Sequence, residues 1–129
     1  MGIDLKQIST AALAYLGDSV WELSVRQMLV EKGIADSATL NREALGYVTA
    51  KAQAAAVKRI LGVLSEEEQA IYKRGRNIGH TNVPKHATVS EYRMATGLEA
   101  LFGYLFLEGR SERIMELFAL AFEEGEQQT

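Results

Sequence analysis

The fold is indicated first by residues 11–25, Ala11-Ala-Leu-Ala-Tyr-Leu-Gly-Asp-Ser-Val-Trp-Glu-Leu-Ser-Val25, and then by residues 95–107, Ala95-Thr-Gly-Leu-Glu-Ala-Leu-Phe-Gly-Tyr-Leu-Phe-Leu107. Both stretches are rich in alanine and leucine, and the whole sequence holds one proline, so both favour helix. Asp18 and Glu99 stand inside these apolar stretches, neither of which contains Lys or Arg. A carboxylate among buried neighbours loses hydration that a cation, a hydrogen-bond donor or a metal ion must offset. The two acids are therefore the first candidates for functional residues.

The pattern predicts consecutive helices along the rest of the chain. Ser65-Glu-Glu-Glu68 has the form of a capping box, with Ser at the N-cap and Glu three residues later. No strand pattern is present, and residues 78–88 form the longest irregular stretch. We expect one all-α domain over residues 1–129, with a frayed tail at 125–129. The expected helices run from Ser9 or Thr10 to Gly33, from Ser37 to near Gly46, from near Val48 to Leu61, from Ser65 to Asn77, from Thr88 or Ser90 to near Glu108, and from Ser111 to near Glu124.

Composition excludes several classes of protein. The 129 residues suit one hydrophobic core, and no apolar run reaches the roughly 18 residues of a membrane span. The N-terminal residues lack the apolar region of a signal peptide. Cysteine is absent, which excludes disulfides and thiolate metal sites, and two histidines are too few for a histidine-based zinc site without carboxylates. We expect a soluble, cytoplasmic protein with no membrane partner.

The net charge of −3 hides an uneven distribution. Residues 73–93 carry five Lys or Arg and one acidic residue, whereas the rest of the chain carries nine Lys or Arg and sixteen acidic residues. Both histidines, His80 and His86, also lie in the basic segment. An acidic body with one basic segment is typical of polyanion binding, although a solvated surface loop explains the same charges equally well.

Asp18 and Glu99 would meet if their two helices packed together. Gly17 precedes Asp18, and Gly97 and Gly103 flank Glu99, which indicates close helix contacts because glycine inside a helix usually has a packing reason. Two carboxylates in contact would suit Mg²⁺ or Mn²⁺, which take oxygen ligands and retain waters. The alternatives are a partly exposed Asp18 on a mixed helix face and a Glu99 whose head reaches solvent.

Two motifs resemble those of the ribonuclease III family. Leu16-Gly-Asp-Ser-Val20 is similar to the core of the family signature, and Thr96-Gly-Leu-Glu-Ala-Leu-Phe-Gly103 is similar to its second motif. The resemblance is closer still to the Mini-ribonuclease III branch, short bacterial proteins without a double-stranded-RNA-binding domain. It extends over residues 13–18, 73–77, 92–93 and 102–108, in the expected order.

The resemblance implies a metal-dependent endoribonuclease. Asp18 and Glu99 would be both catalytic and metal-binding residues, with Mg²⁺ as the cofactor and Mn²⁺ as a substitute. The full-length family carries further carboxylates at the positions of Ala14 and Thr96, so this chain keeps a reduced set, as Mini-ribonuclease III does. The resemblance also implies a homodimer that cuts both strands of double-stranded RNA, leaves 5′-phosphate and 3′-hydroxyl ends, and matures the large-subunit ribosomal RNA precursor, with a ribosomal protein presenting the substrate.

Duplex RNA is recognised mainly through its A-form shape, 2′-hydroxyls and phosphates. We expect RNA contacts from the basic segment and from one lysine outside it. The residues are Arg74, Arg76, Lys85 and Arg93, then Lys73, Asn77, His80 and His86, and Lys51. The aromatic residues of the apolar helices are expected in the core or in a dimer interface.

Two rival hypotheses remain open. The reduced carboxylate set is also compatible with a module that binds structured RNA and cleaves it weakly or not at all. The acidic composition alone is compatible with a helical interaction protein that has no RNA role.

Overall fold

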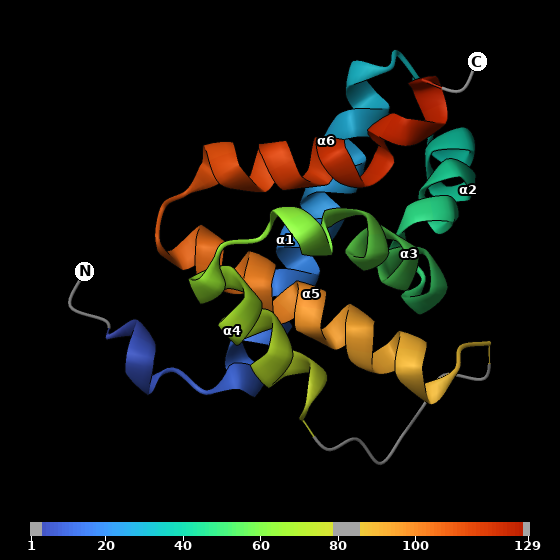
Figure 1. Cartoon of the computed structure of the whole chain (residues 1–129). Helices are drawn as coiled ribbons and strands as arrows, with labels where there is room; N and C mark the ends of the chain where they lie inside the picture. The colour runs from blue at the N-terminus through green and yellow to red at the C-terminus, as the bar shows by residue number, and fades with distance from the viewer. Residues whose placement is uncertain (1–3, 79–85, 128–129) are drawn as a thin grey trace.

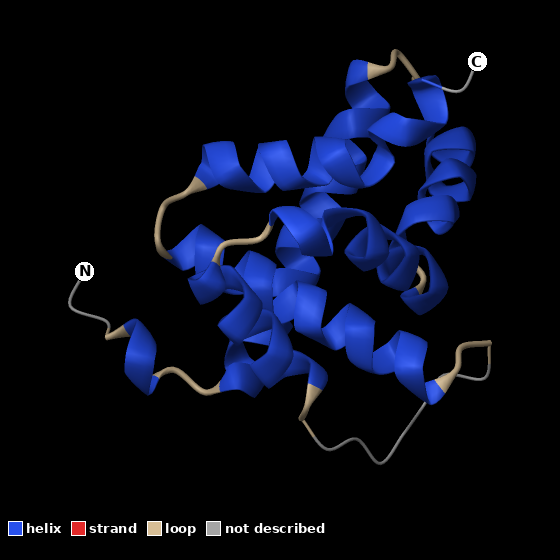
Figure 2. Ribbon diagram, in the orientation of Figure 1, coloured by secondary structure: helices blue, strands red, loops and turns tan. Residues whose placement is uncertain are grey.

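The computed structural model describes the backbone of residues 4–78 and 86–127, and side chains as far as Phe122. All regular elements in these residues are helical, which confirms the all-α class (Figure 2). None of the described helices is long and apolar enough to cross a membrane. The elements are the short 3₁₀ helices η1 (Leu5–Gln7) and η2 (Leu61–Val63), and the α-helices α1 (Thr10–Glu31), α2 (Ser37–Val48), α3 (Ala50–Ile60), α4 (Glu66–Arg76), α5 (Val89–Leu107) and α6 (Ser111–Gln127).

Capping side chains set the helix starts that the sequence predicts. Ser9 accepts a hydrogen bond at the start of α1, and full capping boxes open α4 at Ser65 and α5 at Thr88. The structure differs at α2, which continues past Gly46 to Val48 because Thr49 caps α3 directly afterwards. It differs again at α6, which ends at Gln127 rather than near Glu124, since the residues in between include good helix formers.

The helix α5 lies at the centre of the molecule, with α1 behind it and α4 in front of it in the view of Figure 1. Its residues from Ala95 to Leu105 are buried except Glu99, because α1, α3 and α4 all pack against it. A helix that is apolar on nearly every face is typical of such a buried position. Glu99 therefore occupies the most enclosed helix of the fold.

Glycines allow the central helices to cross at backbone contact. A methyl group on Gly17 of α1 would overlap the backbone carbonyl of Glu99 on α5, and one on Gly103 would overlap the carbonyl of Leu13. On the other side of α5, a methyl group on Gly75 of α4 would lie 2.8 Å from the Cα of Gly97. The close helix approach predicted at Gly17 is confirmed, and it places Asp18 directly beside α5.

Aromatic side chains fill the core between α1, α5 and α6. The Trp21 ring lies edge-on to Phe102 and Phe118, at centroid distances of 5.2 and 5.1 Å. Two other aromatics of the apolar helices point outward instead, since Tyr15 is 85% exposed and Phe106 is 51% exposed. Tyr15 and Phe106 therefore do not lie in the core of the single chain, and a dimer interface is the expected position that remains for them.

Candidate active site

The structure brings Asp18 and Glu99 together in one pocket. Asp18 comes from α1 and Glu99 from α5, and they meet because the helices cross at Gly17 and Gly103. Asp18 is exposed, so of the two alternatives left open for it, the exposed carboxylate on a mixed helix face is confirmed. The pocket has a volume of about 300 Å³, and its lining consists of Ala11, Ala14, Tyr15, Asp18, Ile78, Tyr92, Thr96 and Glu99.

The pKa of the Glu99 carboxyl is raised from 4.5 to about 7, chiefly by burial. The neighbouring Asp18 raises it further through its charge and through a side-chain hydrogen bond, while a hydrogen bond from Gln53 lowers it. In the part of the chain that the structure describes, neither acid forms an ion pair with Lys, Arg or His. Two acids in contact without a compensating cation form an electrostatically unfavourable site, which a cation would relieve.

The donor set fits a hard divalent cation such as Mg²⁺. The described residues contain no cluster of three or more His, Cys, Asp or Glu that could hold a metal, so the protein offers a pair of carboxylates here and no more. Mg²⁺ is commonly held by one or two carboxylates together with waters and substrate phosphates. The pair is therefore sufficient for Mg²⁺ and too small for a site built only from protein ligands.

Ala14 and Thr96 line the same pocket as the two acids. These are the positions at which the resemblance to full-length ribonucleases III would place further carboxylates. Ala14 offers no ligand, and the Thr96 hydroxyl donates a hydrogen bond of 3.0 Å to the backbone carbonyl of Tyr92. The missing acids thus leave open space beside Asp18 and Glu99 without disturbing the helix crossing.

Sequence reasoning missed Gln53, which contacts the site from α3. Its side chain is 3% exposed, and its Nε2 donates a hydrogen bond of 3.3 Å to Oε2 of Glu99. The signal in the sequence was a single polar residue within the alanine-rich run from Ala52 to Ala56. That pattern indicates a buried face of α3 without showing which residue the amide would meet.

Three of the predicted RNA contacts gather in a second pocket, of about 330 Å³. Arg76 and Asn77 at the end of α4 face Arg93 near the start of α5, and Val89, Ser90 and Met94 complete the lining. The Arg76 guanidinium lies 5.9 Å from the centre of the Tyr72 ring, and its Nε donates a hydrogen bond of 3.2 Å to Asn77.

The cationic pocket adjoins the carboxylate pocket. The consecutive residues Asn77 and Ile78 line one pocket each, and so do Tyr92 and Arg93. Arg74 also reaches this side of the molecule, where its Nη2 donates a hydrogen bond of 3.0 Å to Thr10 at the first turn of α1. Basic and acidic groups therefore line neighbouring hollows, as binding and cleavage of a polyanion would require.

The remaining predicted contacts are less closely grouped. Lys73 and His86 are exposed, and Lys51 is exposed on α3, two residues before Gln53. Lys85 and His80 lie outside the described residues. The structure therefore places Arg76, Asn77 and Arg93 together, and RNA binding by these three and by the others stays a prediction.

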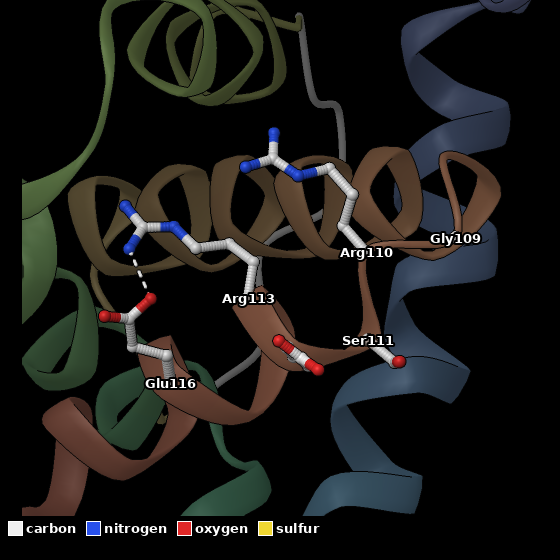
Figure 3. Close-up of a pocket in the computed structure, with 6 residues that line it drawn as sticks. Gly109, Arg110, Ser111, Arg113 and Glu116 are labelled. Carbon is white, nitrogen blue, oxygen red and sulfur yellow. Dashed lines mark hydrogen bonds and ion pairs between the residues drawn. The ribbon is translucent and has the colours of Figure 1, made fainter.

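Another pocket lies at the other end of α5, away from both acids. It measures about 700 Å³ and surrounds the turn from Gly109 to Ser111, where Arg110 and Arg113 extend from the backbone (Figure 3). Arg113 forms ion pairs with Glu116 at 2.8 Å and with the buried Glu68 at 2.7 Å. The ion pair between Arg113 and Glu68 joins α6 to α4, so Arg113 has a structural role in this pocket.

Comparison with known proteins gives consistent results. A model of the ribonuclease III domain matches residues 11–110. A Mini-ribonuclease 3 from Enterococcus faecalis is 46% identical over 116 residues, which cover 88% of each chain. One from Streptococcus pneumoniae is 44% identical over 117 residues, which cover 89% of this chain and 91% of the relative. A crystal structure of a protein from Fusobacterium nucleatum superposes with a TM-score of 0.84 at 35% identity, covering 95% of this chain and 98% of the other.

Proposed function

The chain belongs to the ribonuclease III family of endoribonucleases, and we propose that it hydrolyses double-stranded RNA at a divalent cation held by Asp18 and Glu99. The observation that carries the proposal is the meeting of these two acids in one pocket without an ion-paired cation among the described residues. Residues 1–129 would form one catalytic domain of this kind.

Asp18 and Glu99 would hold Mg²⁺, or Mn²⁺ in its place, directly or through water. Held by these two residues, such an ion would supply activation of a water molecule for attack on phosphorus and stabilisation of the leaving oxygen. Glu99 must be ionised to serve as a ligand, so its pKa of about 7 makes its proton the competitor of the cation near neutral pH. With two protein ligands, most of the coordination shell is left to water and to phosphate oxygens of the RNA. Hydrolysis would leave a 5′-phosphate and a 3′-hydroxyl.

The neighbouring cationic pocket would hold the RNA backbone. Arg76 and Arg93 face each other across it, and Asn77 adds an amide that is able to bond phosphate oxygens. Lys73, Arg74, Lys85 and Lys51 would extend the contact along the duplex. Affinity that rests mainly on contacts with phosphates should fall as the salt concentration rises, with a slope set by the number of those contacts.

A second copy of the chain would complete the enzyme. Tyr15 forms part of the rim of the carboxylate pocket while 85% of its own surface is exposed, and Leu23, two helical turns further along α1, is 61% exposed. Exposed apolar side chains along one helix face favour association with another protein surface. A two-fold dimer would present two such sites, one for each strand of the duplex.

The resemblance to Mini-ribonuclease III supports one biological substrate, the precursor of large-subunit ribosomal RNA, processed in the cytoplasm. A ribosomal protein bound to that precursor would present the cleavage site.

The second candidate function is a module that binds structured RNA without cutting it. It is favoured by Ala14 and Thr96, which line the pocket but supply no carboxylate. The two functions differ in turnover, since only the enzyme would cut an excess of substrate.

The test is incubation of the purified protein with a tenfold excess of a long perfect RNA duplex, with a single strand of the same sequence as the control. We expect the duplex alone to be cut, in Mg²⁺ and not in EDTA, to products that carry 5′-phosphates. Asp18→Asn should abolish cutting while the circular dichroism spectrum stays helical. Stable binding of the duplex with no cleavage in Mg²⁺ or Mn²⁺ would favour the binding module instead.

A further inference from the structure

Gln53 is a buried polar side chain whose position packing does not explain. Three polar or charged residues of the described chain are buried, namely Gln53, Glu68 and Thr96. Glu68 pairs with Arg113, and Thr96 bonds the backbone of its own helix, so both have structural partners. Gln53 instead bonds Glu99, one of the two acids of the candidate metal site.

The amide of Gln53 is only half satisfied within the described residues. Its Nε2 donates to Glu99, but no described residue donates a hydrogen bond to its Oε1. A buried acceptor without a partner destabilises a fold by an amount similar to the gain from one good hydrogen bond. An apolar side chain of the same length would therefore serve stability at this position as well as glutamine does.

The contact restricts Glu99 at its functional end. A glutamate side chain has several rotatable bonds, and the hydrogen bond from Gln53 restricts them by holding Oε2 of Glu99 at 3.3 Å from Nε2 of Gln53. Asp18 of α1 also interacts with the Glu99 carboxyl and lines the same pocket. Since α3 and α1 approach Glu99 as separate helices, Gln53 and Asp18 together define how the carboxylate lies.

Such partners matter in known metal sites, because they orient the ligand before the metal arrives. Losing one typically weakens metal binding by about 10–100-fold. The effect should be large here, since the described residues offer two carboxylates at this site and no third acid to compensate for a misplaced one.

The geometry assigns Gln53 as a positioning residue, whose amide holds the Glu99 carboxylate in the orientation that binds the divalent cation together with Asp18. This inference rests on the proposed metal site at Asp18 and Glu99. Gln53 itself contacts neither the ion nor the RNA in this scheme, and it acts through Glu99.

The test uses Mn²⁺ alone as the probe, with no RNA present. Free Mn²⁺ is measured by electron paramagnetic resonance in titrations of the wild type, Gln53→Met and Asp18→Asn. We expect Gln53→Met to bind Mn²⁺ about 10–100-fold more weakly than the wild type, a loss of about 1.4–2.8 kcal/mol. Its melting temperature in EDTA should be equal to that of the wild type or higher. In cleavage assays, the Mg²⁺ concentration for half-maximal rate should rise while the KM for RNA stays constant.

The matched control is Gln27→Met. Gln27 also donates a hydrogen bond to a glutamate, at 3.1 Å to Oε2 of Glu31, but on the exposed surface of α1. Removing this amide should leave Mn²⁺ binding unchanged. An equal fall in Mn²⁺ affinity in Gln53→Met and Gln27→Met would overturn the inference, because the effect would then be unrelated to the contact with Glu99.

Two results would assign Gln53 a structural role and overturn the inference. The first is Mn²⁺ affinity equal to that of the wild type in Gln53→Met. The second is failure to fold in EDTA of both Gln53→Met and a second variant, Gln53→Leu. If the wild type binds no Mn²⁺, or Asp18→Asn binds it as tightly as the wild type, the proposed metal site itself is wrong and the inference fails with it.

Discussion

Replacing Glu99 by glutamine is expected to stabilise the metal-free protein at high pH and to leave its stability nearly unchanged at low pH. Burial and the charge of Asp18 raise the pKa of Glu99 to about 7 in the folded protein, against 4.5 in the unfolded chain. The folded protein therefore holds this proton more tightly than the unfolded one does. Glutamine cannot ionise, yet its amide oxygen can still accept the hydrogen bond from Gln53.

The sign and size of this stability difference follow from the linkage between folding and proton binding. Below pH 4.5 both states are protonated, so Glu99 does not affect the pH dependence of unfolding. Between pH 4.5 and about 7 the unfolded chain ionises first, and the free energy of unfolding of the wild type falls as the pH rises. At about 1.4 kcal/mol for each pH unit, the full loss above pH 7 is about 3 kcal/mol. Glu99→Gln should avoid this loss.

The assay is urea unfolding in EDTA at pH 4.5 and pH 8, followed by the fluorescence of Trp21, which is the only tryptophan and is buried. The variant should exceed the wild type by about 3 kcal/mol more at pH 8 than at pH 4.5. Added Mg²⁺ should stabilise the wild type at pH 8 and have little effect on the variant. Glu22→Gln is the control, since Glu22 forms an exposed ion pair with Arg26 and should change stability by at most about 0.5 kcal/mol.

An equal difference between wild type and Glu99→Gln at both pH values would refute the reasoning. It would mean that Glu99 ionises normally in the folded protein, so that neither its burial nor Asp18 disfavours the carboxylate. The site would then lack the unfavourable charge that a metal ion is proposed to relieve.

Three further substitutions test the packing and the RNA surface. Gly17→Ala should destabilise the fold by about 3 kcal/mol in urea unfolding, because its methyl group would overlap the backbone carbonyl of Glu99. Arg113→Ala should destabilise it by about 3 kcal/mol at neutral pH, since Glu68 is left buried without its cation. Hydrogen bonding from Arg113 lowers the pKa of Glu68. The difference in stability between wild type and Arg113→Ala should therefore shrink as the pH falls below the pKa of an ordinary carboxyl group. Arg76→Ala should weaken binding of any duplex in EDTA and reduce the salt slope by about one, measured by filter binding.

Each of these substitutions has a control elsewhere in the chain. Gly46→Ala in α2, where a methyl group meets nothing within 4 Å, should stabilise by about 0.5–1 kcal/mol, and equal tolerance at Gly17 would contradict the helix crossing. A Glu68→Met and Arg113→Met double variant should recover most of the stability, because no unpaired charge remains. Arg110→Ala, at the opposite end of α5 from Arg93, should leave the salt slope unchanged. A salt slope reduced as much as in Arg76→Ala would mean that the RNA does not bind specifically at the pocket of Arg76 and Arg93.

Local signals were sufficient to predict most of the fold. The capping box at Ser65 predicted the start of α4, because side chains three residues apart close on each other whatever the tertiary structure. The start of α5 was left open between Thr88 and Ser90, and Thr88 caps it. Gly17 indicated a close helix contact for a reason that is also local, since glycine is disfavoured in a free helix. Helix ends were predicted less well, since α2 continues past Gly46 to Val48 and α6 continues past Glu124 to Gln127.

The site could be predicted only in part, because its contacts join distant segments. The motifs around Asp18 and Glu99 indicated the pair, but α1 is apolar on several faces, so its sequence left open whether Asp18 is buried or exposed. Gln53 lies 46 residues from its partner Glu99, and no spacing rule links them. The ion pair between Glu68 and Arg113 was not predicted for the same reason, because 45 residues separate the two side chains in the sequence.

The most direct test of the central claim is cleavage of a long RNA duplex by the wild type and Glu99→Gln, side by side in Mg²⁺. The variant is expected to be folded and, in EDTA at pH 8, more stable than the wild type. If Glu99 holds the metal ion, the wild type should cut the duplex, and the cleavage rate of the variant should be lower by a factor of at least about 100. Equal cutting by both proteins would contradict the claim and would make Glu99 a structural residue.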